Sequence, residues 1–275
     1  MEFLKKNCNL KELGLNKTNL DEIELIHKKH GNRLYRIKFR GEYSIIKWFK
    51  VGDDNEVKSY NLLNKLGVPT INLLGQTENA LLLEDLDYSQ DLRLATADVL
   101  NSRETGVAVA RWYQKLHSAG EQFLSESEQI SDFLKWQIDE LDSHILYNLG
   151  QHFNIQELPG WQLAIDNIEV LRDRIKSLPV TINYNDFYWT NLALSREGLP
   201  RQAVMFDYHL MGKGSAILIV EMLHLVWGQK QKKHSWKLMD LLINGNVSWI
   251  YPYLYYTVSK MCLNEKKFPS GVKLY

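Results

Sequence analysis

The chain has 275 residues, which is enough for one large domain or two modest ones, each with its own core. Hydrophobic residues make up 45% of the chain and charged residues 24%, which is ordinary for a globular protein. The 33 basic residues balance the 33 acidic residues, so the net charge gives no reason to expect binding to nucleic acid or to an anionic membrane.

Cysteine usage and hydropathy indicate an intracellular protein. The two cysteines, Cys8 and Cys262, lie near opposite ends and lack metal-ligand spacing. The N-terminal residues have no apolar stretch of signal-peptide length, and the longest later apolar run, residues 216–220, is too short to span a bilayer. We therefore expect a cytoplasmic location, with neither nucleic acid nor membrane as a partner. The sequence leaves the oligomeric state open.

Residues 20–86 have the pattern of a strand-rich region. Residues 34–39 alternate apolar and polar positions, and residues 43–49 are β-branched and aromatic. Gly41, in the turn 40–42, predicts a hairpin between these two strands. Residues 71–76 and 79–86 predict two further strands.

One helix is predicted between these pairs of strands. Its apolar face is formed by Val57, Tyr60, Leu63 and Leu66, at helical spacing. Asn55 is the expected N-cap, and Gly67 followed by Pro69 is the expected end.

From about residue 90 onward the apolar period becomes helical. A short strand-rich segment interrupts it, at residues 180–207. The expected helices are 106–117, 126–148, 161–175 and several between about 216 and 262. A sheet-rich lobe followed by a helical lobe predicts a ligand cleft where the two lobes join.

The most informative segment is residues 182–194, INYNDFYWTNLAL. Asp186 and Asn191 have the spacing of a kinase catalytic loop, and Asp207 follows sixteen residues later at the end of an apolar run. The same spacing also fits a plain polar turn between two strands. The acid, amide and second acid nevertheless occur in the order that a magnesium-dependent phosphoryl transferase needs.

These motifs resemble the aminoglycoside phosphotransferase and choline kinase family over residues 25–228. The central family motif reads H-G-D-x-x-x-x-N, and Asp186 and Asn191 match its acid and amide. Tyr184 stands in place of the histidine. The resemblance implies that Asp186 is the catalytic base and that Asn191 and Asp207 are metal ligands.

The first lobe contributes the expected nucleotide site. Lys47, in the run SIIK, resembles the lysine that contacts the α- and β-phosphates, and Glu56 resembles its ion-pair partner. The segment 81–86, LLLEDL, is similar to the hinge between lobes. The resemblance implies that adenine pairs with the Glu84 carbonyl and the Leu86 amide, while Leu83 lines the pocket.

Two stretches depart from the family pattern. The phosphate-covering turn has a single glycine, and backbone amides near Gly31 and Asn32 are expected to cradle phosphate. Ile219 occupies the region where the family has an acidic residue that braces the catalytic loop, and Glu221 is the nearest acid.

The resemblance implies an α+β, protein-kinase-like fold with two lobes. Residues 1–86 would form a small nucleotide-binding lobe with an antiparallel sheet and one helix. Residues 87–275 would form a larger, mostly helical lobe with the catalytic loop and the acceptor site. The implied activity is transfer of the γ-phosphate of ATP, with Mg²⁺, to a hydroxyl of a small molecule such as an aminoglycoside. Tyr188 and Trp189, inside the catalytic loop, are expected to contact this acceptor.

Three other readings stay open. The chain could phosphorylate choline, another amino alcohol or a sugar instead of an aminoglycoside. The missing histidine, the sparse glycine turn and Ile219 would also suit a weak or inactive nucleotide-binding pseudokinase. A protein kinase ranks last, because Asp207 is followed by Tyr208 and His209 and no D-F-G or A-P-E sequence occurs.

Overall fold

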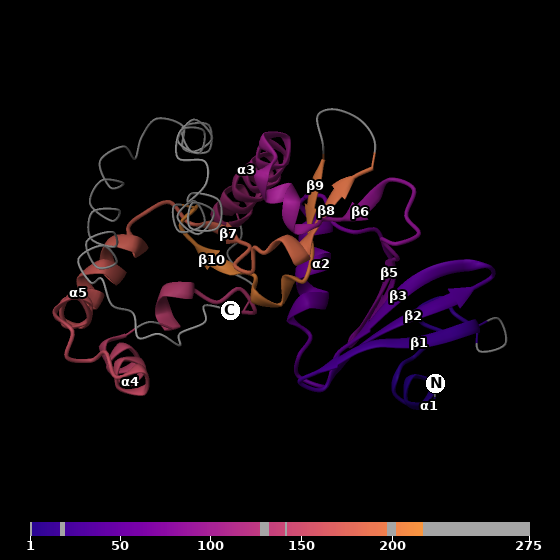
Figure 1. Ribbon diagram of the computed structural model, residues 1–275, viewed down its shortest axis with the longest axis horizontal. Helices are drawn as coiled ribbons and strands as arrows, with labels where there is room; N and C mark the ends of the chain where they lie inside the picture. Colours follow the sequence, from indigo (N-terminus) through magenta and orange to yellow (C-terminus); the bar gives the residue numbers. More distant parts are fainter. Residues whose placement is uncertain (1, 17–19, 127–131, 141, 197–201, 217–275) are drawn as a thin grey trace. The chain divides into compact units, whose positions relative to one another are not determined.

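The computed structural model describes residues 2–16, 20–126, 132–140, 142–196 and 202–216 (Figure 1). These residues fall into two compact units. The first unit holds the described residues up to Trp136 and those from Pro179 onward, and the second holds those from Gln137 to Leu178. The predicted helices between 216 and 262, with Ile219, Glu221 and Cys262, lie outside the described residues. The predicted lobe boundary at residue 86 stays a prediction.

A five-stranded antiparallel sheet forms most of the N-terminal half of the first unit (Figure 1). Its strand order is β1-β2-β3-β5-β4. The strands are β1 Leu20–Lys29, β2 Asn32–Phe39, β3 Glu42–Trp48, β4 Leu73–Thr77 and β5 Ala80–Glu84. The four strands expected from alternation are thereby confirmed, and β1 is added to them.

Both hairpins at the β2 strand turn through residues with positive φ. The β1 to β2 turn uses His30 (φ 52°) and Gly31 (φ 96°), and the β2 to β3 turn uses Arg40 (φ 53°) and Gly41 (φ 84°). Paired left-handed residues match the twist of antiparallel strands, which explains why a glycine occurs in each turn. The predicted hairpin at Gly41 is confirmed.

The single helix inserted in the sheet is α2, Asn55–Lys65. Its buried residues include Val57, Tyr60 and Leu63, as the spacing predicts. The predicted cap is wrong. Asn55 is already helical, and Asp54 occupies the N-cap position without a side-chain cap hydrogen bond. The Asp54 carboxylate instead pairs with Lys58, at 2.9 Å.

The N-terminal residues cover one face of the sheet. Helix α1, Glu2–Asn7, and the turns after it bury Leu4, Leu10, Leu13 and Leu15 against Ile46 and other sheet residues. A hydrogen bond also joins this segment to the sheet: Trp48 Nε1 on β3 donates to the Asn7 carbonyl at 3.0 Å. The sequence patterns did not predict this layer.

Helix α3, Arg103–Glu126, packs on the short strands that carry the candidate site. It extends the predicted helix 106–117 at both ends. Strands β7 (Thr181–Asn183) and β10 (Gly212–Gly214) form one pair. Strands β6 (Leu92–Leu94), β8 (Leu192–Ser195) and β9 (Ala203–Met205) form a second sheet, in the order β6-β8-β9.

The second unit contains α4, Ser143–Phe153, and α5, Pro159–Lys176. Helix α5 confirms the prediction for 161–175, whereas the predicted continuous helix over 126–148 is wrong. Within that span α3 ends at Glu126, a short 3₁₀ turn covers Gln137–Glu140, and α4 begins anew. Asp142 explains the restart, because its side chain accepts from Ile145 N at 2.7 Å as an N-cap.

Three further 3₁₀ turns complete the described elements: Ala97–Asn101, Trp189–Asn191 and Tyr208–Leu210. No helix among the described residues is both long and apolar enough to cross a membrane.

Candidate active site

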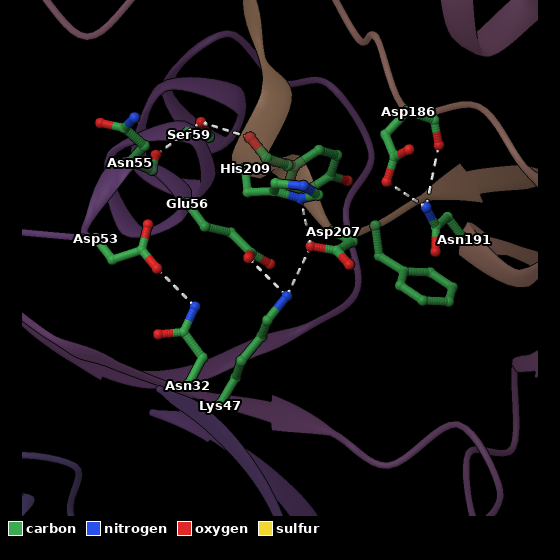
Figure 2. Close-up of polar contacts among 12 residues, drawn as sticks. Asn32, Lys47, Asp53, Asn55, Glu56, Ser59, Asp186, Asn191, Asp207 and His209 are labelled. Atoms are coloured by element: carbon green, nitrogen blue, oxygen red, sulfur yellow. Dashed lines mark hydrogen bonds and ion pairs between the residues drawn. The ribbon is translucent and has the colours of Figure 1, made fainter. Parts of the chain in front are cut away.

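Lys47 lies at the centre of the candidate site. It extends from β3, and its Nζ is 2.6 Å from Glu56 Oε2 and 2.8 Å from Asp207 Oδ1 (Figure 2). The three residues come from β3, from α2 and from the segment after β9, and Asp207 lies 160 residues after Lys47. The structure therefore joins three of the residues that the motifs singled out.

Glu56 is held in the first turn of α2 with only 2% of its side chain exposed. Burial raises the pKa of the Glu56 carboxyl, and the charge of Lys47 opposes that rise. Burial also acts to lower the pKa of Lys47, but the two carboxylates outweigh it and raise that pKa. A buried carboxylate without its lysine would carry a large desolvation cost, so the pair is mutually dependent.

Asp207 lies two residues after the end of β9, in a left-handed conformation with φ 64°. Non-glycine residues rarely adopt this region, and such strain concentrates at functional positions. Burial acts to raise the pKa of Asp207, but the hydrogen bond with His209 and the charge of Lys47 hold that pKa well below its ordinary value. Asp207 therefore carries a negative charge at neutral pH.

Asp186 and Asn191 are hydrogen-bonded to each other. Asn191 Nδ2 donates to Asp186 Oδ2 at 2.8 Å and to the Asp186 backbone carbonyl at 3.0 Å (Figure 2). The Phe206 amide also donates to the Asn191 carbonyl at 3.1 Å, which ties this loop to the residue between β9 and Asp207. The amide nitrogen of Asn191 is thus used within the loop, and its side-chain oxygen is the atom suited to bind a cation.

Tyr184, which stands in place of the histidine of the resembled motif, braces this loop. Its ring is fully buried, and its hydroxyl donates to the Phe206 carbonyl at 2.7 Å. Tyr113 Oη donates in turn to the Tyr184 carbonyl at 3.2 Å. Burial raises the pKa of the Tyr184 hydroxyl, so it stays protonated and acts as a hydrogen-bond donor.

Carboxylate and imidazole groups gather beside the loop. One ligand atom each of Asp186, Asp207 and His209 lie within 4.8 Å of one another. His209 was not among the predicted site residues, although its position two residues after Asp207 is visible in the sequence. Its Nδ1 is 2.8 Å from Asp207 Oδ1, and this hydrogen bond raises the pKa of His209.

A cavity of about 650 Å³ opens next to Lys47. Its volume lies in the range of small-molecule and cofactor sites. Leu83, Glu84 and Leu86 line it, as the expected hinge requires. Other lining residues are Leu34, Ile45, Lys47, Glu56, Asp207 and His209, whereas Asp186 and Asn191 do not line it.

The predicted phosphate-covering turn is a tight hairpin at His30 and Gly31. Asn32 lines the cavity, but its side chain is engaged by protein groups: Nδ2 donates to Asp53 Oδ2 at 2.7 Å, and Oδ1 accepts from Lys50 N at 3.1 Å. Gly31 is not a lining residue, whereas its neighbour His30 is. Phosphate binding by amides near Gly31 and Asn32 stays a prediction.

Two arginines that bind the segment after β5 were not predicted. Arg36 pairs with Asp85, its Nε lying 2.5 Å from Asp85 Oδ2, and it also contacts Asp87. Arg196 donates to the carbonyls of Leu86, at 3.1 Å, and Ser89, at 2.7 Å. Both arginines hold the segment after β5 in place. The sequence offers one sign of these contacts, the acidic composition of residues 84–87, which favours ion pairs with basic side chains.

Tyr188 and Trp189 lie together, with ring centroids 5.9 Å apart, and half of Tyr188 is exposed. Neither residue lines the cavity. Their predicted contact with an acceptor stays a prediction.

Solved structures of small-molecule kinases resemble this structure. The choline kinase LicA from Streptococcus pneumoniae aligns with a TM-score of 0.58 and 14% identity, over 98% of this chain and 92% of that chain. The macrolide 2'-phosphotransferase MphH from Brachybacterium faecium aligns with a TM-score of 0.57 and 12% identity, over 96% of this chain and 94% of that chain. The chain has the fold of these phosphotransferases. An aminoglycoside-3'-phosphotransferase of type VIII aligns with a TM-score of 0.53 and 13% identity, over 88% of this chain and 93% of that chain.

The α+β, protein-kinase-like fold expected from the motifs is confirmed by these neighbours. Searches with the sequence alone match no family model and no curated protein. Identities of 12–14% with coverage of nearly the whole chain mean that the phosphotransferase fold is kept while most side chains differ.

Proposed function

We propose that this protein is an enzyme of the aminoglycoside phosphotransferase and choline kinase family, transferring the γ-phosphate of ATP to a hydroxyl of a small molecule with Mg²⁺. The observation that carries the proposal is the contact of Lys47 with both Glu56 and Asp207, at 2.6 and 2.8 Å, beside the linked pair Asp186 and Asn191. A plain polar turn would not need a buried lysine–glutamate pair or an aspartate in a left-handed conformation. The phosphotransferase fold adds independent support.

The cavity suits a nucleotide. Leu34, Ile45 and Leu83 provide apolar surface for a base, and Lys47 provides a fixed positive charge for phosphate oxygens. The Glu84 carbonyl and the Leu86 amide would pair with the edge of adenine. Arg196 binds the Leu86 carbonyl, which fixes the backbone at this position.

The donor set suits a divalent cation. Asp207 is ionised, and the Asn191 side-chain oxygen is left for a cation because the amide nitrogen is bound to Asp186. Carboxylate and amide oxygens are the ligands that Mg²⁺ prefers. Bound there, Mg²⁺ would neutralise negative charge on the phosphates during transfer.

Asp186 would orient the acceptor. Its Oδ2 accepts from Asn191, which sets the direction of the carboxylate, and its carboxylate would accept a hydrogen bond from the acceptor hydroxyl and take its proton. Lys47 would hold the phosphates in line with that hydroxyl. Because the transition state of phosphoryl transfer is loose, positioning and charge neutralisation supply most of the acceleration.

The acceptor is a small hydroxylated molecule. The neighbours are named as choline, aminoglycoside and macrolide phosphotransferases, so aminoglycosides, amino alcohols, macrolides and sugars are the candidates to test. Tyr188 and Trp189 would contact it from within the catalytic loop. A cytoplasmic location, where ATP is abundant, is part of the same proposal, as is the absence of nucleic acid and membrane partners.

A thermal-shift experiment tests the nucleotide half of the proposal. ATP with MgCl₂ should raise the melting temperature of the wild type, and Asp207→Asn should abolish the part of the shift that depends on magnesium. Asp166→Asn, a change on α5 outside the site, is the matched control and should behave as wild type. Absence of any nucleotide-dependent shift in the wild type would refute the assignment.

A second candidate is an inactive pseudokinase, and an assay with acceptors distinguishes it from an active enzyme. It predicts nucleotide binding with no turnover of any acceptor. The intact contacts among Lys47, Glu56, Asp186, Asn191 and Asp207 favour the active enzyme instead.

A further inference from the structure

The phosphotransferase assignment gives His209 no role. It lies in the 3₁₀ turn Tyr208–Leu210, two residues after Asp207, and it lines the cavity. Its ring is directed at Asp207, with Nδ1 2.8 Å from Oδ1, and about half of the side chain is exposed (Figure 2). An imidazole that is both accessible and fixed against a carboxylate is well placed to bind a ligand of the site.

The spacing of the three side chains fits a shared ion. A protein oxygen or nitrogen lies about 2.0 to 2.2 Å from a small divalent metal, so two ligands of one ion lie at most about 4.4 Å apart. The ligand atoms of Asp186, Asp207 and His209 lie within 4.8 Å of one another. Shifts of a few tenths of an ångström would therefore bring Asp207 and His209 onto one ion, with the Asp186 carboxylate beside it.

We propose that His209 is a nitrogen ligand of the divalent cation at this site and that it shifts the preference of the enzyme from Mg²⁺ toward Mn²⁺. This inference rests on the proposed function, because it assigns a further ligand to the same cation. Mg²⁺ is a hard ion that selects oxygen ligands and gives up water reluctantly. First-row transition ions accept imidazole readily, so one nitrogen in place of an oxygen favours them.

The Asp207 contact is consistent with this role. Two neighbouring ligands of one octahedral ion with bonds of about 2.1 Å lie about 3 Å apart, and Nδ1 lies 2.8 Å from Asp207 Oδ1. In the tautomer that carries its proton on Nε2, Nδ1 has the lone pair that a metal needs. The competing explanation is that His209 only positions Asp207 through the hydrogen bond and never touches the ion.

Metal titrations measure the preference. The dissociation constants of Mn²⁺ and Mg²⁺ are determined on the full chain with saturating ADP, for wild type and His209→Asn. Asparagine keeps a hydrogen-bond donor for Asp207 but offers only an oxygen to the ion. We expect His209→Asn to weaken Mn²⁺ binding roughly tenfold or more while Mg²⁺ binding changes by less than about threefold. Equal loss of both ions, or no loss, would overturn the inference.

Pulsed electron paramagnetic resonance of the bound Mn²⁺ separates ligation from positioning. A directly bound imidazole gives a nitrogen hyperfine coupling, which we expect in the wild type and not in His209→Asn. The matched control is His144→Asn, an exposed histidine on α4, which should keep the coupling and both affinities. A wild-type spectrum identical to that of His209→Asn would exclude a nitrogen ligand. The wild-type spectrum is decisive even where the variant folds poorly.

Failure of this inference is distinguishable from failure of the proposed function. If the wild type binds ADP and Mg²⁺ but shows no histidine coupling, His209 is not a ligand and the kinase proposal stands. If it binds neither ADP nor either ion, both proposals are wrong.

Discussion

Tyr184→Phe tests whether the Tyr184 hydroxyl braces the loop that carries Asp186. The substitution removes one oxygen and leaves the fully buried ring in place against its aromatic neighbours. Among the residues that the structure describes, the hydrogen bond lost is the donation from the Tyr184 hydroxyl to the Phe206 carbonyl at 2.7 Å. Because Phe206 precedes Asp207, this bond connects the loop of Asp186 to the segment after β9 that carries Asp207.

The expected loss in the free energy of unfolding is about 1–2 kcal/mol. A neutral hydrogen bond contributes about 0.5–1.5 kcal/mol net, and a carbonyl left without its donor adds to the cost. For a chain of this size, about 1 kcal/mol lowers the melting temperature by about 2–4 °C, so the variant should melt about 2–8 °C below wild type.

Urea unfolding of wild type and Tyr184→Phe measures the difference directly. The matched control is Tyr147→Phe on α4, where an exposed hydroxyl bonds to Gln151 at 3.1 Å; its loss should stay within about 0.5 kcal/mol. If Tyr184→Phe costs no more than Tyr147→Phe, the hydroxyl does not brace the loop and the reasoning is wrong.

Three further predictions follow from contacts at or near the site. Glu56→Gln removes the charge 2.6 Å from Lys47 and should raise the KM for ATP roughly 10-fold or more in steady-state assays, since a charged hydrogen bond contributes about 1.5–3 kcal/mol; an unchanged KM would contradict the role of the pair. Gly120→Ala would place a Cβ 2.7 Å from Ile182 N, so it should lower the free energy of unfolding in urea by about 1–3 kcal/mol, although alanine favours a helix. Burial lowers the pKa of His117 to about 4 from 6.5, so the unfolded chain binds the proton first as the pH falls. Stability should therefore drop by about 2 kcal/mol between pH 7 and pH 5, and urea unfolding of His117→Asn should show a smaller drop.

The residues of the candidate site could be singled out because the motifs that they resemble have them in a fixed order. Lys47, Glu56, Asp186, Asn191 and Asp207 have distinctive neighbours in the sequence, and the structure brings the first, second and fifth into direct contact. Their identification depended on residue type and spacing, which local sequence carries. Their catalytic roles remain part of the proposal.

His209 and the two arginines could not be predicted in this way. A histidine two residues after an aspartate does not by itself predict a contact between them. The contact forms because the 3₁₀ turn Tyr208–Leu210 directs the His209 ring back at Asp207. Arg36 and Arg196 likewise find their partners across strands and loops distant in sequence.

The errors in secondary structure have local causes. Apolar spacing over residues 126–148 fits one long helix, but the Asp142 side chain caps a new helix and so fixes a break there. The Asn55 cap was misplaced by one residue, because Asp54 pairs with Lys58 instead of with backbone amides. The layer formed by the N-terminal residues was missed because its leucines, such as Leu4, become buried only when they pack on the sheet.

Transfer of labelled phosphate tests the central claim most directly. Wild type and Asp186→Asn are incubated with γ-labelled ATP, Mg²⁺ and a panel of choline, ethanolamine, aminoglycosides, macrolides and sugars, and the labelled products are separated. We predict that the wild type labels at least one acceptor and that Asp186→Asn does so roughly 100-fold more slowly. Labelling of an acceptor at equal rates by both proteins would contradict the role of Asp186. Nucleotide binding by the wild type without labelling of any acceptor would contradict the assignment of a phosphotransferase.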